Sequence, residues 1–187
     1  MSPRRRPQVL LFPGAGSASS HSSLVAIEQA VSPLRCARAD FPYRLAGRKP
    51  PDRPAVLMQA VVDAAASLGP GPLVLGGRSM GGRMCSMVVA EGRVPCAIGL
   101  VLISYPLHPP GKPDRLRVEH LPQISVPCLF VSGTRDTFGT PDELTHWSAT
   151  IAGPVEHVWI DGRGHDLKHS DELVAAAVAD WVKRLPG

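Results

Sequence analysis

The sequence predicts an α/β protein in which helices cover both faces of a parallel sheet. Short apolar runs recur along the chain, and each is followed by a turn rich in glycine or proline and then by a helical pattern. Several runs are almost continuously apolar, which is typical of strands buried on both faces. The 187 residues suffice for one domain with its own core. We therefore expect a single three-layer α/β/α sandwich over residues 1–187.

The apolar runs and the patterns between them give the expected elements in order. Helix starts are indicated by Ser22 and Ser170 as N-caps, and by Thr140 followed by Pro141 and two acidic residues. The expected strands lie at 8–12, 35–40, 73–76, 97–104, 126–132 and 155–160, and the expected helices at 22–31, 54–68, 81–91, 141–151 and 171–184.

One long irregular stretch precedes the fifth expected strand. Residues 105–123 contain prolines at 106, 109, 110, 113 and 122, which disfavour regular structure. The stretch is too short for a lid domain. We expect a loop on a pocket rim, with one helical turn around residues 115–121.

Composition argues against several classes of function. The formal net charge is +4, but the basic residues are scattered, so no nucleic-acid surface is expected. No apolar stretch reaches the ~18 residues of a membrane span, and the apolar run behind the basic N-terminus is too short for a secretory signal. The four cysteines form no CxxC pair and are typical of small buried hydrophobes in a reducing compartment. We expect a cytoplasmic protein.

The strongest motif follows the third expected strand. Gly77-x-Ser79-x-Gly81 has the spacing of a nucleophile elbow, and an apolar strand precedes it while a helix follows it. The sharp turn presents the serine hydroxyl to solvent, and the glycines avoid clashes between strand and helix. The helix also directs its N-terminal amides towards the same place. Ser79 is therefore the candidate nucleophile.

A serine nucleophile needs a base and a group that orients the base. His165 lies in a glycine-rich loop just after the last expected strand, where the carboxyl ends of parallel strands gather. Asp136 follows the fifth strand, although an aspartate there also suits a turn or a cap. The order Ser79, Asp136, His165 supports the catalytic interpretation of all three.

The oxyanion of such a reaction needs two backbone N–H groups. Met80, directly after the nucleophile, should supply one. Ala15 is the candidate for the other, because Gly14 and Gly16 let the backbone of the loop after the first strand approach a substrate. The same loop lacks both GxGxxG and a following GK[ST], so nucleotide binding is a minor alternative.

Three further residues are candidates for substrate binding: Arg78, Tyr105 and His108. Simple loop packing explains Tyr105 and His108 equally well. His165 and His169 have a spacing that suits a metal on a helix, but a third ligand is missing and glycines precede His165. We expect no metal and no cofactor.

These motifs resemble the α/β-hydrolase superfamily, and within it the small dienelactone-hydrolase-like group that includes the hydrolase domain of the testis-expressed protein family. The segments that carry the resemblance are spread over nearly the whole chain: 11–16, 75–83, 104–112, 130–136 and 164–166. The resemblance implies an α/β-hydrolase fold with a six-stranded parallel sheet that lacks the superfamily's first two strands. The expected strand order is 2-1-3-4-5-6.

The chain departs from the resembled families at two positions. Pro13 stands where many superfamily members have a histidine, and Ser79 stands where dienelactone hydrolases have a cysteine. The dienelactone substrate is therefore not implied. The expected function is hydrolysis of small acyl substrates of the carboxylic ester type through an acyl-enzyme. The alternatives are a non-catalytic scaffold on the same fold, an acyltransferase and an amidase.

Overall fold

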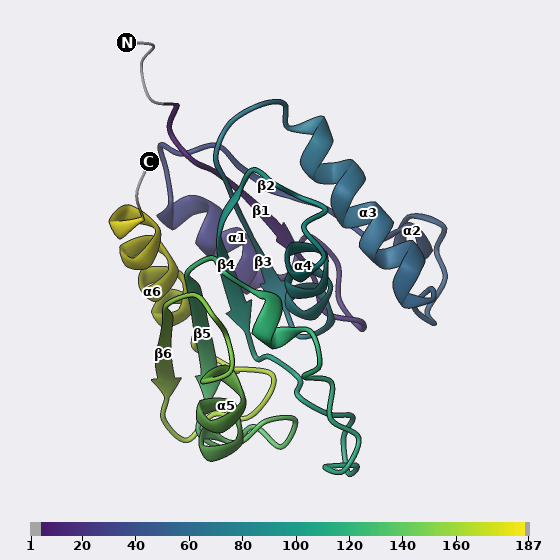
Figure 1. The fold of residues 1–187 in the computed structure, drawn as a ribbon, viewed down its shortest axis with the longest axis vertical. Helices are drawn as coiled ribbons and strands as arrows, with labels where there is room; N and C mark the ends of the chain where they lie inside the picture. Colours follow the sequence, from purple (N-terminus) through teal and green to yellow (C-terminus); the bar gives the residue numbers. More distant parts are fainter. Residues whose placement is uncertain (1–4, 186–187) are drawn as a thin grey trace.

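The computed structural model describes residues 5–185 and contains the expected six-stranded, all-parallel sheet (Figure 1). The strands lie in the order β2-β1-β3-β4-β5-β6, as predicted. Their bounds are β1 Gln8–Phe12, β2 Cys36–Arg38, β3 Leu73–Arg78, β4 Ala97–Ile103, β5 Cys128–Gly133 and β6 Val155–Ile160.

Six α-helices and one short 3₁₀ helix connect the strands within the described residues. The five predicted helices are present, and the short helix α2 is an addition. Their bounds are α1 Ser22–Ala30, α2 Pro42–Leu45, α3 Pro54–Ser67, α4 Met80–Ala90, η1 Leu121–Gln123, α5 Pro141–Ser148 and α6 Asp171–Arg184.

Three local predictions about helices need correction or qualification. The turn predicted at 115–121 is wrong, because the Arg117 N–H donates to the Leu107 carbonyl and a 3₁₀ helix begins only at Leu121. Ser22 is the first residue of α1 and not its N-cap, since the side chain of His21 accepts the capping bond. Ser170 is an N-cap by position, but its side chain makes no capping bond.

The sheet separates two apolar cores, as the three-layer prediction requires. Successive residues of β1 point to opposite faces: Val9 and Leu11 join one core, while Leu10 and Phe12 join the other. Helices α1 and α6 cover the first face, and α2, α3, α4 and α5 cover the second (Figure 1). Because both faces are covered, the functional groups are left to the ends of the strands.

The cysteines only partly match the prediction that they are buried. Cys85 and Cys128 are buried and Cys36 is half-buried, but Cys96 is exposed in the turn just before β4. Burial raises the pKa of Cys36 and of Cys128 to about 12, so both thiols are poor nucleophiles. In the part of the chain that the structure describes, no helix combines the length and apolarity needed to cross a bilayer.

The strand order reverses direction at β1, and this reversal locates the site. From β1 the chain first moves outward to β2, then returns to the other side of β1 as β3. The loops that leave the carboxyl ends of β1 and β3 therefore separate to opposite faces and leave a crevice between them. The loop at 13–17 and the elbow at Ser79 border this crevice.

Candidate active site

Ser79 lies in a strained turn between β3 and α4. Its backbone has φ 46° and ψ −114°, a region that residues with a side chain rarely adopt. Such strain persists only where the surrounding structure holds it in place. Here β3 is buried along its whole length and the Ser79 N–H donates to the Ile103 carbonyl of β4 at 2.8 Å. The turn therefore has the backbone form of a nucleophile elbow.

The glycines on either side of Ser79 are required by close backbone approach. A Cβ atom at Gly77 would overlap the Phe12 carbonyl of the neighbouring strand. At Gly81 it would lie 2.5 Å from the Phe12 oxygen and 2.6 Å from the Pro13 oxygen. Since both obstacles are backbone atoms, they cannot move aside by rotation of a side chain. The Gly-x-Ser-x-Gly spacing thus follows from how tightly β1 packs against the elbow.

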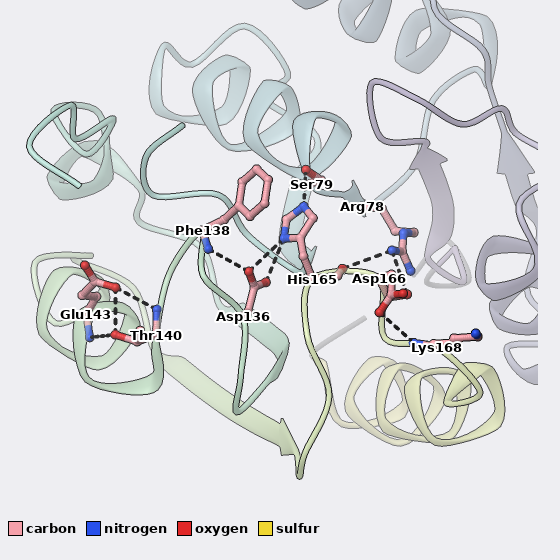
Figure 2. A network of polar contacts seen from close by, with 9 residues as sticks. All are labelled: Arg78, Ser79, Asp136, Phe138, Thr140, Glu143, His165, Asp166 and Lys168. Carbon is pink, nitrogen blue, oxygen red and sulfur yellow. Dashed lines mark hydrogen bonds and ion pairs between the residues drawn. The ribbon is translucent and has the colours of Figure 1, made fainter. Parts of the chain in front are cut away.

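His165 connects Ser79 to Asp136 in one hydrogen-bonded chain (Figure 2). The His165 Nε2 lies 2.8 Å from the Ser79 Oγ, and its Nδ1 lies 2.8 and 3.0 Å from the two carboxylate oxygens of Asp136. Asp136 is fully buried, whereas the side chain of His165 is partly exposed. The structure therefore brings the three predicted residues together in the geometry of a serine–histidine–aspartate triad.

The loop after β6 has to cross the sheet to bring His165 to Ser79, because β6 is an edge strand and β3 is central. The loop crosses directly over the end of β5, where the Arg135 N–H donates to the Arg163 carbonyl at 2.8 Å. A Cβ atom at Gly133 would overlap that same carbonyl, so the crossing needs glycine there. These contacts bring His165 to the centre of the sheet.

Arg78 fixes the far end of this crossing loop. One nitrogen of its guanidinium, Nη2, lies 3.3 Å from the His165 carbonyl oxygen and 3.1 Å from that of Asp166 (Figure 2). Its other terminal nitrogen, Nη1, is buried without a partner among the described residues. Burial lowers the pKa of this guanidinium, and the carboxylates of Asp171, Asp166 and Asp136 oppose that effect. The guanidinium of Arg78 thus contacts the backbone of the loop that carries His165.

Phe138 supports both the base and the carboxylate. Its ring is stacked on the His165 imidazole, with centroids 3.9 Å apart and planes 18° apart. Its backbone N–H donates to the Asp136 Oδ1 at 2.9 Å (Figure 2). The carboxylate therefore accepts hydrogen bonds from two sides, and the imidazole is held flat against an aromatic face.

A hollow of about 380 Å³ opens beside Ser79, and we call it the triad hollow. It is lined by residues of the loops after β1, β3, β5 and β6: Gly14, Ala15, Gly16, Ser17, His21, Arg78, Ser79, Phe138, His165 and Asp166. Tyr105 and His108 are not among its lining residues, so their predicted place in the pocket is wrong. Tyr105 is fully buried in the core, and His108 is buried beside Glu143, with its Nε2 at 3.5 Å from the carboxylate.

Ala15 lies in the loop after β1 and lines the triad hollow together with Ser79. The Gly14 carbonyl accepts from the Ser17 N–H at 3.1 Å, which closes a tight turn. In a trans peptide the N–H of Ala15 points opposite to that carbonyl, and therefore out of the turn. The hydroxyl of Tyr43 donates to the Ala15 carbonyl at 2.7 Å and anchors the loop from α2. Within residues 5–185 no protein acceptor is bonded to the N–H of Ala15.

Met80 offers a second N–H group at the same place. It is the first residue of α4, and the N–H groups of a first helical turn have no acceptor inside the helix. The described residues provide no other acceptor for it. Met80 and Ala15, the two residues predicted to hold an oxyanion, thus both have N–H groups to which no backbone acceptor is bonded among the described residues.

A second serine–histidine pair lies deeper in the molecule. The Ser86 Oγ is 2.8 Å from the His120 Nε2, and the Tyr105 hydroxyl is within 3.1 Å of both. Ser86 is fully buried and also bonds to the Arg83 carbonyl. No carboxylate among the described residues bonds to His120, and burial lowers the pKa of His120 to about 4. The pair ties the loop at 105–123 to α4 and lacks the third member of a triad.

Three residues of the site were not predicted from the sequence: Tyr43, Phe138 and His21. Tyr43 lies on a four-residue helix and bonds to a loop far away in the chain. The position of Phe138, two residues after the predicted triad residue Asp136, could have indicated that it lies at the site. Among residues 5–185, no three His, Cys, Asp or Glu side chains are grouped so that they could hold a metal ion.

The fold and the serine–histidine–aspartate geometry together define the class of the protein, the α/β hydrolases. Residues 5–181 match the model of the family described as "Alpha/beta hydrolase domain", and the chain belongs to this family.

Solved structures with the same fold include several esterases and related enzymes. Est1E from Butyrivibrio proteoclasticus, solved with ferulic acid bound, has a TM-score of 0.75 at 18% identity, covering 98% of this chain and 91% of its own. A metagenome-derived lipolytic enzyme has a TM-score of 0.77 at 14% identity, covering 97% and 95%. A Xanthomonas campestris protein assigned to the alpha/beta superfamily has a TM-score of 0.73 at 21% identity, covering 95% and 99%.

Proposed function

We propose that the protein is a serine hydrolase that cleaves small carboxylic esters through an acyl-enzyme on Ser79. The observation that carries this proposal is the 2.8 Å contact of the His165 Nε2 with the Ser79 Oγ, combined with the bond of Nδ1 to the buried Asp136. A serine hydroxyl is a weak nucleophile until a base removes its proton. An imidazole oriented by a carboxylate is the base that this reaction needs.

The first half of the proposed reaction forms the acyl-enzyme. His165 takes the proton of the Ser79 hydroxyl while the Oγ bonds to the ester carbonyl carbon. The N–H groups of Met80 and Ala15 hold the oxyanion that forms. The intermediate then collapses, the bond to the alcohol oxygen breaks, and His165 gives its proton to the departing alcohol. Asp136 stabilises the imidazolium that exists between these two proton transfers.

Water completes the second half. His165 takes a proton from water as the water oxygen bonds to the acyl carbon. When that intermediate collapses, the Ser79 oxygen leaves and recovers a proton from His165, and a carboxylic acid is released. The openness of the triad hollow to solvent gives water direct access to the acyl group.

The substrate class rests on the site and on the resemblance in fold. A hollow of about 380 Å³ suits a small ester, and the similar fold of Est1E with its bound ferulic acid supports an ester of that size. We place the chain near the small dienelactone-hydrolase-like group on the motifs around Ser79, with serine chemistry in place of cysteine. The four free cysteines support a cytoplasmic location.

Hydrolysis of p-nitrophenyl acetate and p-nitrophenyl butyrate by the wild type and two serine variants tests the proposal. The wild type and Ser86→Ala should release nitrophenol, whereas Ser79→Ala should lose roughly 10³-fold or more of the rate. Ser86→Ala is the matched control, because it removes the other histidine-bonded serine. Wild-type rates in Ser79→Ala would contradict the proposal, and ester products formed with added methanol in preference to acid would favour the acyltransferase alternative.

A further inference from the structure

His21 is a titratable side chain in the triad hollow for which the proposed reaction has no role. It lies in the loop after β1, directly before α1, and it is one of the residues that line the same hollow as Ser79 and His165. It is neither a neighbour of Ser79 in the chain nor bonded to the triad. The structure therefore places a second imidazole next to where a substrate would bind.

The hydrogen bonds of His21 determine where its proton lies. The Ser23 backbone N–H donates to the His21 Nδ1 at 3.3 Å, and the Ser23 Oγ lies 3.0 Å from the same nitrogen. A backbone N–H can only donate, so Nδ1 must be the unprotonated acceptor. The neutral ring then carries its proton on Nε2.

The Nε2 of His21 remains free to bond a ligand. Among residues 5–185 no protein acceptor is bonded to it, and it is not one of the buried atoms without a partner, so solvent reaches it. Burial of the ring, followed by the positive charge of Arg78, lowers the pKa of His21, while Asp171 acts in the opposite direction. The ring therefore stays neutral near neutral pH and offers one N–H donor.

The other polar side chains of the hollow differ from His21 in how their donors and acceptors are used. The Ser17 hydroxyl donates to the Gly14 carbonyl at 3.3 Å. Arg78 directs Nη2 at two carbonyl oxygens, and its Nη1 is shielded from solvent. Asp166 carries a carboxylate, which accepts and does not donate. The Arg78 Nε likewise has no protein partner among residues 5–185 and is not one of the buried atoms without a partner, but it belongs to a charged group, so His21 is the neutral N–H donor of this lining that the triad does not use.

We propose that the Nε2 of His21 donates a hydrogen bond to the substrate and selects esters that carry an oxygen acceptor outside the scissile carbonyl, such as an ether or hydroxyl oxygen. This inference rests on the proposed function and specifies the substrates of the same site. A neutral hydrogen bond is ordinarily worth a factor of roughly 3 to 10 in such a preference. Because the contact recognises substrate, it acts on kcat/KM for matched substrates.

The test compares isosteric ester pairs in the wild type and in His21→Asn. One pair is p-nitrophenyl methoxyacetate and p-nitrophenyl butyrate, and the other is 2-methoxyethyl acetate and butyl acetate. Asparagine is a good N-cap and still accepts from Ser23, but it lacks the Nε2 donor. The ratio of kcat/KM for ether over alkyl ester should fall about 3- to 10-fold in at least one pair. The ratio within one protein removes any general loss of folded protein, and comparison of the ratios of the two proteins removes the inductive effect of the ether oxygen.

His146→Asn is the matched control, since it makes the same substitution at an exposed position of α5 and should leave both ratios unchanged. Ratios in His21→Asn equal to those of the wild type, with hydrolysis still dependent on Ser79, would overturn the inference alone. A wild type without Ser79-dependent hydrolysis would overturn the proposed function and this inference with it. The ¹⁵N spectrum, assigned by difference from His21→Asn, should show Nδ1 unprotonated, and a protonated Nδ1 would also overturn the inference.

Discussion

The guanidinium of Arg78 is bonded to the backbone of Asp166, with Nη2 3.1 Å from the Asp166 carbonyl oxygen. Arg78 is also the residue directly before Ser79. The last residue of β3, directly before the proposed nucleophile Ser79, is therefore bonded to the loop that carries the proposed base His165. Since His165 comes from beyond an edge strand, this contact helps set the distance between Ser79 and His165.

We expect Arg78→Met to lower kcat roughly 10- to 100-fold, because small displacements of catalytic groups have effects of this size. KM for p-nitrophenyl esters should change much less, since the buried guanidinium offers substrate little surface. Removing the partner of two carbonyl groups should also cost about 1–3 kcal/mol of unfolding free energy. Steady-state kinetics and urea unfolding measure both effects. A fully active but less stable variant would show that Arg78 serves stability alone.

The ring of Phe138 should assist the imidazolium that forms during the reaction. A cation over an aromatic face gains about 0.5–1 kcal/mol, so Phe138→Leu should reduce kcat about two- to fivefold. Phe138→Tyr keeps the face and should retain wild-type activity. In both variants the backbone N–H still bonds Asp136, because the substitution leaves the main chain in place. Equal kcat in the leucine and tyrosine variants would argue against a role for the ring.

The elbow should not tolerate a methyl group at Gly77. Its Cβ would overlap the Phe12 carbonyl, and relieving this needs a backbone shift. We expect Gly77→Ala to lower the unfolding free energy by at least about 2 kcal/mol, or the melting temperature by about 4–8 °C for a chain of this size. Gly16→Ala is the control for stability, because a Cβ there meets no atom within 4 Å. Equal melting temperatures of the two variants would refute the packing argument.

The half-buried His120 should make the fold sensitive to acid. Burial, and then the charge of Arg83, lowers its pKa from 6.5 to about 4, so the folded state binds this proton less readily than the unfolded chain. Its contribution to stability is full above pH 6.5 and is lost as the pH falls towards 4. Because His120 is partly exposed, we expect its protonation to lower the free energy of unfolding by about 2 kcal/mol.

His120→Gln isolates this contribution. Urea unfolding at pH 7 and at pH 4.5 should show a smaller loss of stability in the variant than in the wild type. The variant should still lose some stability at acidic pH, because the pKa values of His21 and His157 are also lowered. If His120→Gln loses as much unfolding free energy between pH 7 and pH 4.5 as the wild type does, His120 is not the source of the acid sensitivity.

The sequence was most informative where local chemistry determines structure. Short apolar runs marked all six strands, and four of these runs are nearly continuous, since strands buried on both faces leave little room for polar residues. The spacing around Ser79 marked the elbow, because β1 packs too closely for side chains at Gly77 and Gly81. The bounds of the elements were predicted less accurately: the second strand was expected at 35–40 and spans only Cys36–Arg38.

The contacts that the sequence did not reveal join residues far apart in the chain. Arg78 was predicted to bind substrate and does line the triad hollow, but its hydrogen bond to the Asp166 carbonyl, 88 positions away, was not foreseen. Tyr105 was expected in the pocket because it follows a strand, yet its hydroxyl turns to Ser86 and His120 in the core. Local pattern fixes neither the direction of a side chain nor the path of a crossing loop, so these contacts required the three-dimensional structure.

Labelling with a fluorophosphonate probe tests the central claim most directly, because the probe reacts with an activated serine without any assumption about substrate. The wild type and Ser86→Ala should be labelled, with mass spectrometry placing the adduct on Ser79, while Ser79→Ala and His165→Ala should not be labelled. Labelling of Ser86, undiminished labelling of His165→Ala, or no labelling of a folded wild type would contradict the claim that His165 activates Ser79, and the last result would favour a non-catalytic scaffold.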